Sequence, residues 1–197
     1  MFYSIDGIDG TGKSTQLKLL CDFLRNRHED VVFCRDPGST LLSEEIRSVI
    51  LHRDDLPTGR TAQMFLFMAA RAQLVEEVIA PALKAGKTVV CDRFLLSSVV
   101  YQGYAGGLNP QMIYQTGLIA TGGILPDKTF VLDVPPEIAD KRMGQRTLDR
   151  IEREDAQFKQ RLRNGFISES QKSPDSVIFI DSTQSIEQVH QDIIRYL

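Results

Sequence analysis

The stretch GIDGTGKST, residues Gly7–Thr15, decides the fold of this chain. It matches the pattern G-x-x-x-x-G-K-[ST], with Gly7, Gly12, Lys13 and Ser14 at the fixed positions. An apolar, β-prone stretch precedes it and apolar residues at helical spacing follow it, so the turn joins a strand to a helix. In such a turn backbone N–H groups surround phosphate oxygens, and the start of the helix adds positive potential. The pattern therefore predicts a nucleoside triphosphate site rather than an ordinary glycine-rich turn.

Two side chains of this turn are expected to act on the triphosphate directly. Lys13 would reach the β- and γ-phosphates, and the Ser14 hydroxyl would be a ligand of Mg²⁺. The variable positions of the turn contain no cation. Because charge builds up on the γ-phosphate oxygens during phosphoryl transfer, another part of the chain is expected to supply an arginine there.

Five short, β-rich runs alternate with longer helical patterns along the chain. The predicted strands are Phe2–Ile5, Val31–Cys34, Thr88–Cys91, Thr129–Leu132 and Val177–Ile180. Helices are predicted over Lys13–Arg27, Leu42–Leu51, Thr61–Lys84, Pro110–Ala120, Pro136–Gln145, Arg153–Ser170 and Ile186–Tyr196. Strands separated by helices predict an α/β fold of three layers, in which a five-stranded parallel sheet is flanked by helices.

Polar residues follow each predicted strand, at the edge where ligands bind in a parallel sheet. Besides the phosphate-binding turn, these residues are Arg35–Gly38, Asp92–Arg93, Asp133 and Asp181–Gln184. Asp92 is expected to hold Mg²⁺ through water, and Arg93 is suited to clamp a phosphate with two hydrogen bonds. The alternative for this pair is a salt bridge at the surface.

Two further groups of side chains suit a nucleobase or a sugar. Phe67 and Arg71 lie four residues apart in a predicted helix, where a ring and a guanidinium would hold a planar base. Core packing is the alternative for Phe67. A loop is expected over residues 97–107, and its Ser98, Tyr101 and Gln102 offer hydroxyl and amide groups to a base edge or a sugar. The alternative there is a mobile loop with incidental polar residues.

The positive charge of the chain gathers in the segment Lys141–Arg163. The helical pattern lapses between Gln145 and Glu152, so Arg146 and Arg150 are expected in a loop between two helices. An arginine from this loop would stabilise the charge on the transferring phosphoryl group, and the loop itself would exclude water. A solvated charged face is the alternative.

Composition limits the classes of protein that remain. At 197 residues, a single domain covering the whole chain is expected, and the net charge of −3 argues against a nucleic-acid or membrane partner. Cys21, Cys34 and Cys91 have no framework spacing and no metal-ligand partner nearby, which predicts reduced thiols in a cytoplasmic protein. Neither a signal peptide nor a membrane-spanning run is expected.

Taken together, these motifs resemble the bacterial thymidylate kinase (dTMP kinase) family along the whole chain. The shared motifs are GIDGTGKST, RDPGST, FLFMAAR followed by QLVEEVIAPAL, DRF with SS and YQG downstream, LDRIERED and IDSTQSIEQV. The resemblance implies an ATP-dependent phosphotransferase that converts ATP and dTMP into ADP and dTDP for dTTP synthesis. It also implies Mg²⁺ as the cofactor, a short LID loop at about residues 144–152 and a homodimer.

The resemblance assigns a role to each candidate residue. On the ATP side it implies the phosphate-binding turn (Gly7, Ile8, Asp9, Gly10, Thr11, Gly12, Lys13, Ser14 and Thr15), with Arg142, Ser182 and Gln184 bordering adenine. Asp9 would face the acceptor's 3′-hydroxyl or a metal-bound water. On the dTMP side it implies Arg35 and Arg93 at the phosphate, Pro37 at the thymine methyl, Phe67 stacked on thymine, Arg71, Ser98 and Gln102 at its polar edge, and Tyr101 under the deoxyribose.

In the LID, Arg146 and Arg150 would be the cations, with Asp149 and Glu152 as weaker candidates near the metal or the acceptor. The sequence departs from the family pattern at Ser39, where many relatives carry a second glycine, and at Ser98, where relatives vary. The short LID leaves the choice between Arg146 and Arg150 open.

Three other functions compete with this interpretation. Another nucleoside monophosphate or deoxynucleoside kinase on the same fold is the closest alternative. A GTPase-like switch would need an Asn-Lys-x-Asp guanine motif, which the sequence lacks. A protein that had lost activity would not be expected to keep Lys13 and Asp92–Arg93.

Overall fold

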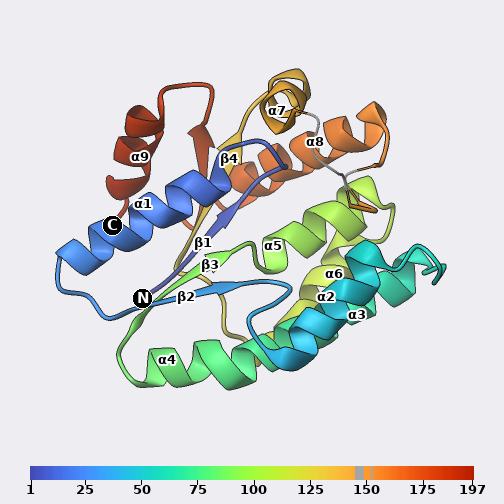
Figure 1. Cartoon of the computed structure of the whole chain (residues 1–197), viewed down its shortest axis with the longest axis horizontal. Coiled ribbons are helices and arrows are strands. Elements are labelled where there is room, and N and C mark those ends of the chain that lie inside the picture. Colours follow the sequence, from blue (N-terminus) through green and yellow to red (C-terminus); the bar gives the residue numbers. More distant parts are fainter. Residues whose placement is uncertain (145–148, 152) are drawn as a thin grey trace.

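In the computed structural model of the chain, which describes residues 1–144, 149–151 and 153–197, five parallel strands form the central sheet (Figure 1). The strands lie in the order β2-β3-β1-β4-β5. Their bounds are β1 Phe2–Asp6, β2 Val31–Arg35, β3 Thr88–Asp92, β4 Lys128–Asp133 and β5 Val177–Asp181. The five predicted strands are confirmed, and each continues one residue further at its carboxyl end.

Helices cover both faces of this sheet, which confirms the three-layer α/β architecture (Figure 1). Within the described residues, the helical segments are α1 Lys13–Asn26, α2 Leu41–His52, α3 Arg60–Leu74, η1 Val75–Ile79, α4 Ala80–Lys84, α5 Leu95–Ser98, η2 Val99–Ala105, α6 Pro110–Thr121, α7 Pro136–Met143, α8 Ala156–Lys172 and α9 Ile186–Ile194. Ile5 of β1 belongs to the buried cluster that α1 and α9 form on one face. Phe2 belongs to the cluster on the other face, with Met68 of α3 and Phe94. Side chains alternate along a strand, so Ser4 and Asp6 point to the same face as Phe2.

Several helix bounds differ from the prediction by one to three residues, and two of these differences have a local structural reason. α8 begins after Asp155, whose carboxylate accepts a hydrogen bond from Phe158 N at 2.7 Å, and the predicted start at Arg153 lies in the preceding turn. α7 ends at a glycine, Gly144, with a φ of 63°. The predicted end of this helix, Gln145, lies outside the described residues.

The long helix predicted over Thr61–Lys84 is divided into α3, η1 and α4. The middle segment, η1, is a π-helical turn, and its last hydrogen bond runs from Ala80 N to Val75 O. Pro81 follows directly and has no backbone N–H to donate. The wider turn therefore ends where the proline removes a regular helical hydrogen bond.

The loop predicted over residues 97–107 is wrong for most of its length, because α5 and η2 make the chain helical up to Ala105. Val99, Val100 and Ala105 are buried, and their packing overrides the turn signal of the glycines. Gly103 allows α6 to approach closely, since a Cβ at this position would lie 3.2 Å from the Pro110 Cα atom.

The polar strand ends meet at one edge of the sheet, as the sequence predicts. In the strand register Arg35 lies beside Asp92, and Asp133 lies beside Asp181. Asp6 ends the central strand β1 and leads directly into the phosphate-binding turn. Among the helices that the structure describes, none has both the length and the apolar character needed to cross a membrane.

Candidate active site

Two adjoining cavities open at this edge of the sheet. The phosphate-loop cavity, about 660 Å³, is lined mainly by the turn residues Asp9–Gln16 and by Arg35, Asp92, Arg142, Met143, Ser182, Gln184, Ile186 and Val189. The aromatic cavity, about 430 Å³, is lined by Pro37, Leu51, His52, Phe67, Arg71, Ser97, Ser98, Tyr101, Gln102, Asp149 and Ile151. Asp9, Asp36, Arg47 and Arg93 line both cavities and form the wall that they share.

Glycines fix the position of the phosphate-binding turn because side chains would collide there. A Cβ at Gly7, whose φ is 134°, would lie 2.4 Å from Leu132 O. A Cβ at Gly10, whose φ is 82°, would lie 2.4 Å from Ala139 O. Both φ values fall in the region that favours glycine. The turn therefore lies against the backbone of β4 and α7 at the sheet edge.

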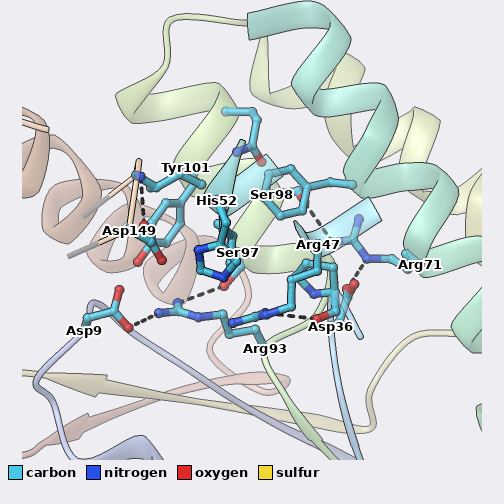
Figure 2. Close-up of a pocket in the computed structure, with 15 residues that line it drawn as sticks. Asp9, Asp36, Arg47, His52, Arg71, Arg93, Ser97, Ser98, Tyr101 and Asp149 are labelled. Carbon is cyan, nitrogen blue, oxygen red and sulfur yellow. Dashed lines mark hydrogen bonds and ion pairs between the residues drawn. The ribbon is translucent and has the colours of Figure 1, made fainter. Parts of the chain in front are cut away.

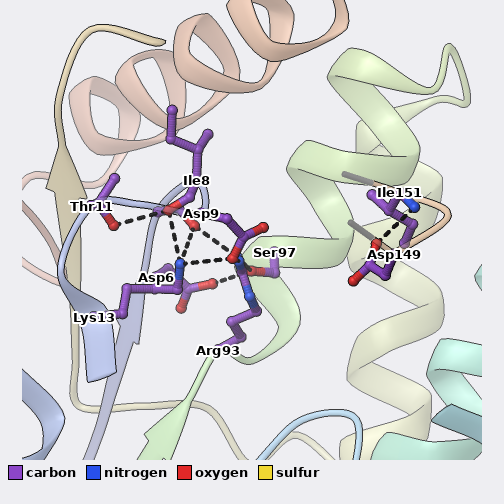
Figure 3. Close-up of polar contacts among 10 residues, drawn as sticks. Asp6, Ile8, Asp9, Thr11, Lys13, Arg93, Ser97, Asp149 and Ile151 are labelled. Carbon is purple, nitrogen blue, oxygen red and sulfur yellow. Dashed lines mark hydrogen bonds and ion pairs between the residues drawn. The ribbon is translucent and has the colours of Figure 1, made fainter. Parts of the chain in front are cut away.

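Lys13 and Arg93 converge on the same part of the turn (Figure 3). Lys13 Nζ donates to Ile8 O at 2.8 Å and to Gly7 O at 3.1 Å. Arg93 Nη1 donates to Gly7 O at 2.7 Å, and Nη2 donates to Asp9 Oδ1 at 2.7 Å. Burial would raise the pKa of Asp9, but the charges of Arg93 and Lys13 hold this pKa well below its ordinary value. Asp9 is therefore a carboxylate that balances two cations at the boundary of the cavities.

Ser14 and Asp92, the two predicted magnesium residues, line the same phosphate-loop cavity. The Oδ1 atom of Asp92 is buried and has no hydrogen-bond partner among residues 1–144, 149–151 and 153–197. Within the same residues, no group of three or more His, Cys, Asp or Glu side chains is arranged to hold a metal. This set fits Mg²⁺ that keeps waters and takes its other oxygen ligands from phosphates.

The far end of the phosphate-loop cavity joins three segments of the chain. Arg142 Nη1 of α7 donates to Ser182 O at 3.0 Å. The Ser182 hydroxyl donates to Thr11 O at 2.6 Å. The predicted residues Arg142, Ser182 and Gln184 therefore lie together beside the turn.

A buried ion pair forms the back of the aromatic cavity (Figure 2). Arg71 is 1% exposed, and its Nε donates to Asp36 Oδ2 at 2.6 Å. Arg71 Nη2 donates to the Ser98 hydroxyl at 2.8 Å. Burial raises the pKa of Asp36, and the adjacent guanidinium opposes that rise. Arg71 and Ser98 are thus brought together, as the sequence predicts, but Arg71 is bonded to both Ser98 and Asp36 within the protein.

Aromatic rings line this cavity from two sides. Phe67 of α3 is 8% exposed and packs against Ile50 and Leu51 of α2, so it is part of the core and of the cavity wall at once. The guanidinium of Arg93 lies over the Tyr101 ring, 5.2 Å from its centroid. The cavity offers a planar ligand two rings and a buried cation.

Arg47 is a site residue that the sequence analysis missed, and Asp36 was named there only as part of the polar end of β2, without its role as the partner of Arg71. Arg47 lies on α2, and its Nη1 donates to Pro37 O at 3.0 Å. It lines both cavities beside Arg93, which makes it a further candidate for an anionic group. The signal in the sequence was its place in the second turn of α2, the helix that follows the polar end of β2.

Arg35 reaches the phosphate-loop cavity but is paired within the protein. Its Nη2 donates to Glu44 Oε1 at 2.9 Å and to Oε2 at 3.1 Å. An acceptor phosphate would have to compete with this carboxylate for the guanidinium.

Arg150 lies against residues 53–59, the connection between α2 and α3. Among the described residues, Arg150 is not one of those that line the two cavities. Its Nη1 donates to the Thr58 hydroxyl at 3.1 Å, and its Nη2 donates to the carbonyl oxygens of Arg53 and Leu56. Its neighbours Asp149 and Ile151 line the aromatic cavity. Arg146 and Glu152, the other predicted residues of this segment, lie outside the described residues.

Comparisons with known proteins agree with this geometry. A family model described as thymidylate kinase matches residues 5–193. The thymidylate kinase of Kosmotoga olearia is 43% identical over 196 residues, which are 99% of this chain and 94% of the relative. That of Thermoanaerobacter sp. is 44% identical over 193 residues, 98% of this chain and 95% of the relative. The crystal structure of thymidylate kinase from Ehrlichia chaffeensis matches with a TM-score of 0.81 and 31% identity, covering 99% of this chain and 97% of that one. Because the match spans nearly the whole chain in sequence and in structure, this protein is a kinase of the thymidylate kinase family.

Proposed function

We propose that this protein transfers the γ-phosphoryl group of ATP to dTMP, giving ADP and dTDP for dTTP synthesis. One observation carries the proposal: the phosphate-loop cavity and the aromatic cavity share a wall that contains Asp9, Arg47 and Arg93. A nucleoside triphosphate in the first cavity and a nucleoside monophosphate in the second would meet with their phosphates at this wall. Such proximity is the main requirement of phosphoryl transfer.

On the donor side, the turn residues would hold the ATP phosphates, and Lys13 would bind the β- and γ-phosphates. Lys13 Nζ is now bonded to carbonyl oxygens of the turn, so it would exchange these partners for phosphate oxygens. Arg142, Ser182 and Gln184 would border adenine. Ser14 and Asp92 would hold Mg²⁺, which would neutralise charge on the phosphates.

On the acceptor side, the aromatic cavity would hold dTMP. Phe67 would stack on thymine, Pro37 would contact its methyl group, and Arg71, Ser98 and Gln102 would meet its polar edge. Tyr101 would lie under the deoxyribose and Asp9 would face the 3′-hydroxyl or a metal-bound water. Arg93, with Arg35 and the newly assigned Arg47, would bind the phosphate.

Two arginines of the connection between α7 and α8 remain candidates for the cation on the transferring phosphoryl group. Arg146 and Arg150 belong to the proposed LID, about residues 144–152. In that role Arg150 would leave Thr58 and the carbonyl oxygens of the α2–α3 connection and turn toward the shared wall. Lys13 and Arg93 are the candidate catalytic residues already at that wall.

We also propose that the protein is a homodimer that works in the cytoplasm as a single kinase domain. Exposed apolar side chains gather on three helices that pack together, α2, α3 and α6. They are Leu41, Leu42, Phe65, Met112 and Ile119. A second copy of the chain would bury this surface. The three cysteines are free, which fits a reducing compartment.

The oligomeric state in light scattering tests the dimer. Ile119→Lys should convert a dimer into a monomer, whereas Tyr196→Lys should leave the dimer intact. A monomeric wild-type protein would refute the dimer.

A coupled ADP-release assay across dTMP, dUMP, UMP, CMP and thymidine tests the function. We expect the highest kcat/KM with dTMP. Removal of one methyl group, as in dUMP, should lower kcat/KM by an amount equivalent to about 1–3 kcal/mol, because the contact with Pro37 and Phe67 would be lost. A higher kcat/KM with UMP, CMP or thymidine would assign the protein to another nucleoside monophosphate or deoxynucleoside kinase on this fold.

A further inference from the structure

Asp6 is a buried carboxyl group that lies behind the phosphate-binding turn (Figure 3). It is 0% exposed and is not among the described residues that line either cavity. Its Oδ1 atom accepts a hydrogen bond from the Ser97 hydroxyl at 2.5 Å. Its Oδ2 atom is buried and has no hydrogen-bond partner in the described part of the chain. A buried carboxyl group with one unpartnered oxygen atom is costly to hold, so its presence needs an explanation.

Ser97 connects this carboxyl group to the shared wall of the cavities. Arg93 Nη1 donates to the Ser97 hydroxyl oxygen at 3.4 Å and to Gly7 O at 2.7 Å. A hydroxyl group has one proton, and Ser97 donates it to Asp6 Oδ1. The Ser97 proton is therefore committed to Asp6, and a lone pair of the same oxygen is left facing Arg93.

Asp6 belongs to a cluster of charged groups. Three acidic groups, Asp6, Asp9 and Asp92, act on the cations Lys13 and Arg93, and Asp9 contacts both cations directly. The pKa of Asp6 is raised, because burial outweighs the Ser97 hydrogen bond and the charges of Arg93 and Lys13, which lower it. Asp6 reaches Arg93 through a single intervening side chain.

We propose that Asp6 is a positioning residue for the acceptor phosphate, which acts through Ser97 on Arg93. Ser97 and Gly7 hold Nη1 of the guanidinium, and Asp9 holds Nη2, so that its plane is fixed toward the shared wall. Without the Asp6 carboxylate, the Ser97 proton can turn toward Arg93 and repel it. The proposal rests on the role proposed above for Arg93 in binding the dTMP phosphate.

Steady-state kinetics of Asp6→Ala, which removes the acceptor of the Ser97 proton, and of Ser97→Ala test the proposal, with ATP and dTMP varied separately. Each substitution should raise the KM for dTMP about tenfold or more, the scale of one hydrogen bond to a charged group. The KM for ATP should stay within about twofold, because the contacts of Lys13 are unchanged. In an Arg93→Ala background, neither substitution should raise the KM for dTMP further.

Two control variants separate positioning from loss of stability. Ser170→Ala removes another buried serine hydroxyl, which donates to Ile167 O at 2.8 Å in α8. Asp127→Asn changes a carboxylate that accepts from Phe2 N at 2.7 Å, at the opposite end of β1. Both should lower the melting temperature without changing the KM for dTMP.

Three outcomes would overturn the proposal. The first is an unchanged KM for dTMP in folded Asp6→Ala or in Ser97→Ala, and Ser97→Ala decides alone when Asp6→Ala fails to fold. The second is a joint rise in the KM for ATP and for dTMP, which indicates a general structural role. The third is an unchanged KM for dTMP in Arg93→Ala, which refutes the proposed role of Arg93 itself. The first and third outcomes are distinguishable, because Arg93→Ala raises the KM for dTMP in the first outcome and leaves it unchanged in the third.

Discussion

The phosphate-loop cavity and the aromatic cavity adjoin each other, but the chain builds them in opposite ways. One continuous segment, Asp9–Gln16, supplies much of the first wall, and backbone geometry at glycines sets its position. The second cavity takes its side chains from α2, the end of β2, α3, α5 and η2, which are far apart in the sequence. A phosphate can be bound by backbone groups in a row, whereas a base must be enclosed from several directions.

The two cavities also differ in how they hold their positive charge. Lys13 is bonded to carbonyl oxygens of its own turn, and it is available to exchange these for phosphate. Arg71 is fixed by a buried carboxylate and by Ser98. We therefore expect a change at Arg71 to affect the stability of the fold, and a change at Lys13 to affect the reaction.

Arg71→Met is expected to have the largest effect. It leaves Asp36 buried without its partner, which should lower the free energy of unfolding by about 3–5 kcal/mol. Denaturant unfolding measures this loss, and the dTMP affinity should fall with it. Adding Asp36→Asn to Arg71→Met should restore part of the stability. If the double variant is no more stable than Arg71→Met, the unpaired Asp36 carboxylate is not the cause of the lost stability. Lys18→Met, which breaks an exposed pair with Asp22, should shift the unfolding midpoint little.

Lys13→Ala should come next, and its effect should be confined to the reaction. Loss of one preorganised charge at the β- and γ-phosphates should cost about 3 kcal/mol or more, a decrease in kcat of about a hundredfold or greater. Titration calorimetry should find dTMP binding unchanged, because the aromatic cavity is intact. Lys18→Ala, on an exposed face of the same helix, is the matched control. A kcat within about threefold of wild type would show that the turn is not catalytic.

Arg150→Ala should have the smallest of the three effects. This variant tests whether Arg150 acts on the phosphoryl group at the wall that the two cavities share. A cation that meets the phosphoryl group only as charge develops should lower kcat by about tenfold, with little change in the KM for dTMP. Thr58→Ala removes a partner that Arg150 has in this structure and should change kcat less than about threefold. If both variants instead raise the KM for dTMP equally, Arg150 anchors the segment beside the aromatic cavity.

Much of the fold was predictable because the strand and helix patterns are local. The strand predictions are confirmed because short apolar runs between turn signals describe buried parallel strands well. The predicted edge of polar strand ends is confirmed for the same reason, since parallel strands must end on one side. The loop over residues 97–107 was wrong because burial of Val99, Val100 and Ala105 outweighs the preference of glycine for turns.

By itself, the sequence determined the phosphate-binding turn and the side of the sheet where the site lies. Both follow from interactions between near neighbours: glycine backbone geometry, a helix start and the direction of parallel strands. Only the tertiary structure decided that Arg71 pairs with Asp36, that Arg47 joins the shared wall and that Arg150 reaches the α2–α3 connection. A long charged side chain takes its position from the acceptors that packing brings within reach, and these acceptors come from distant parts of the chain.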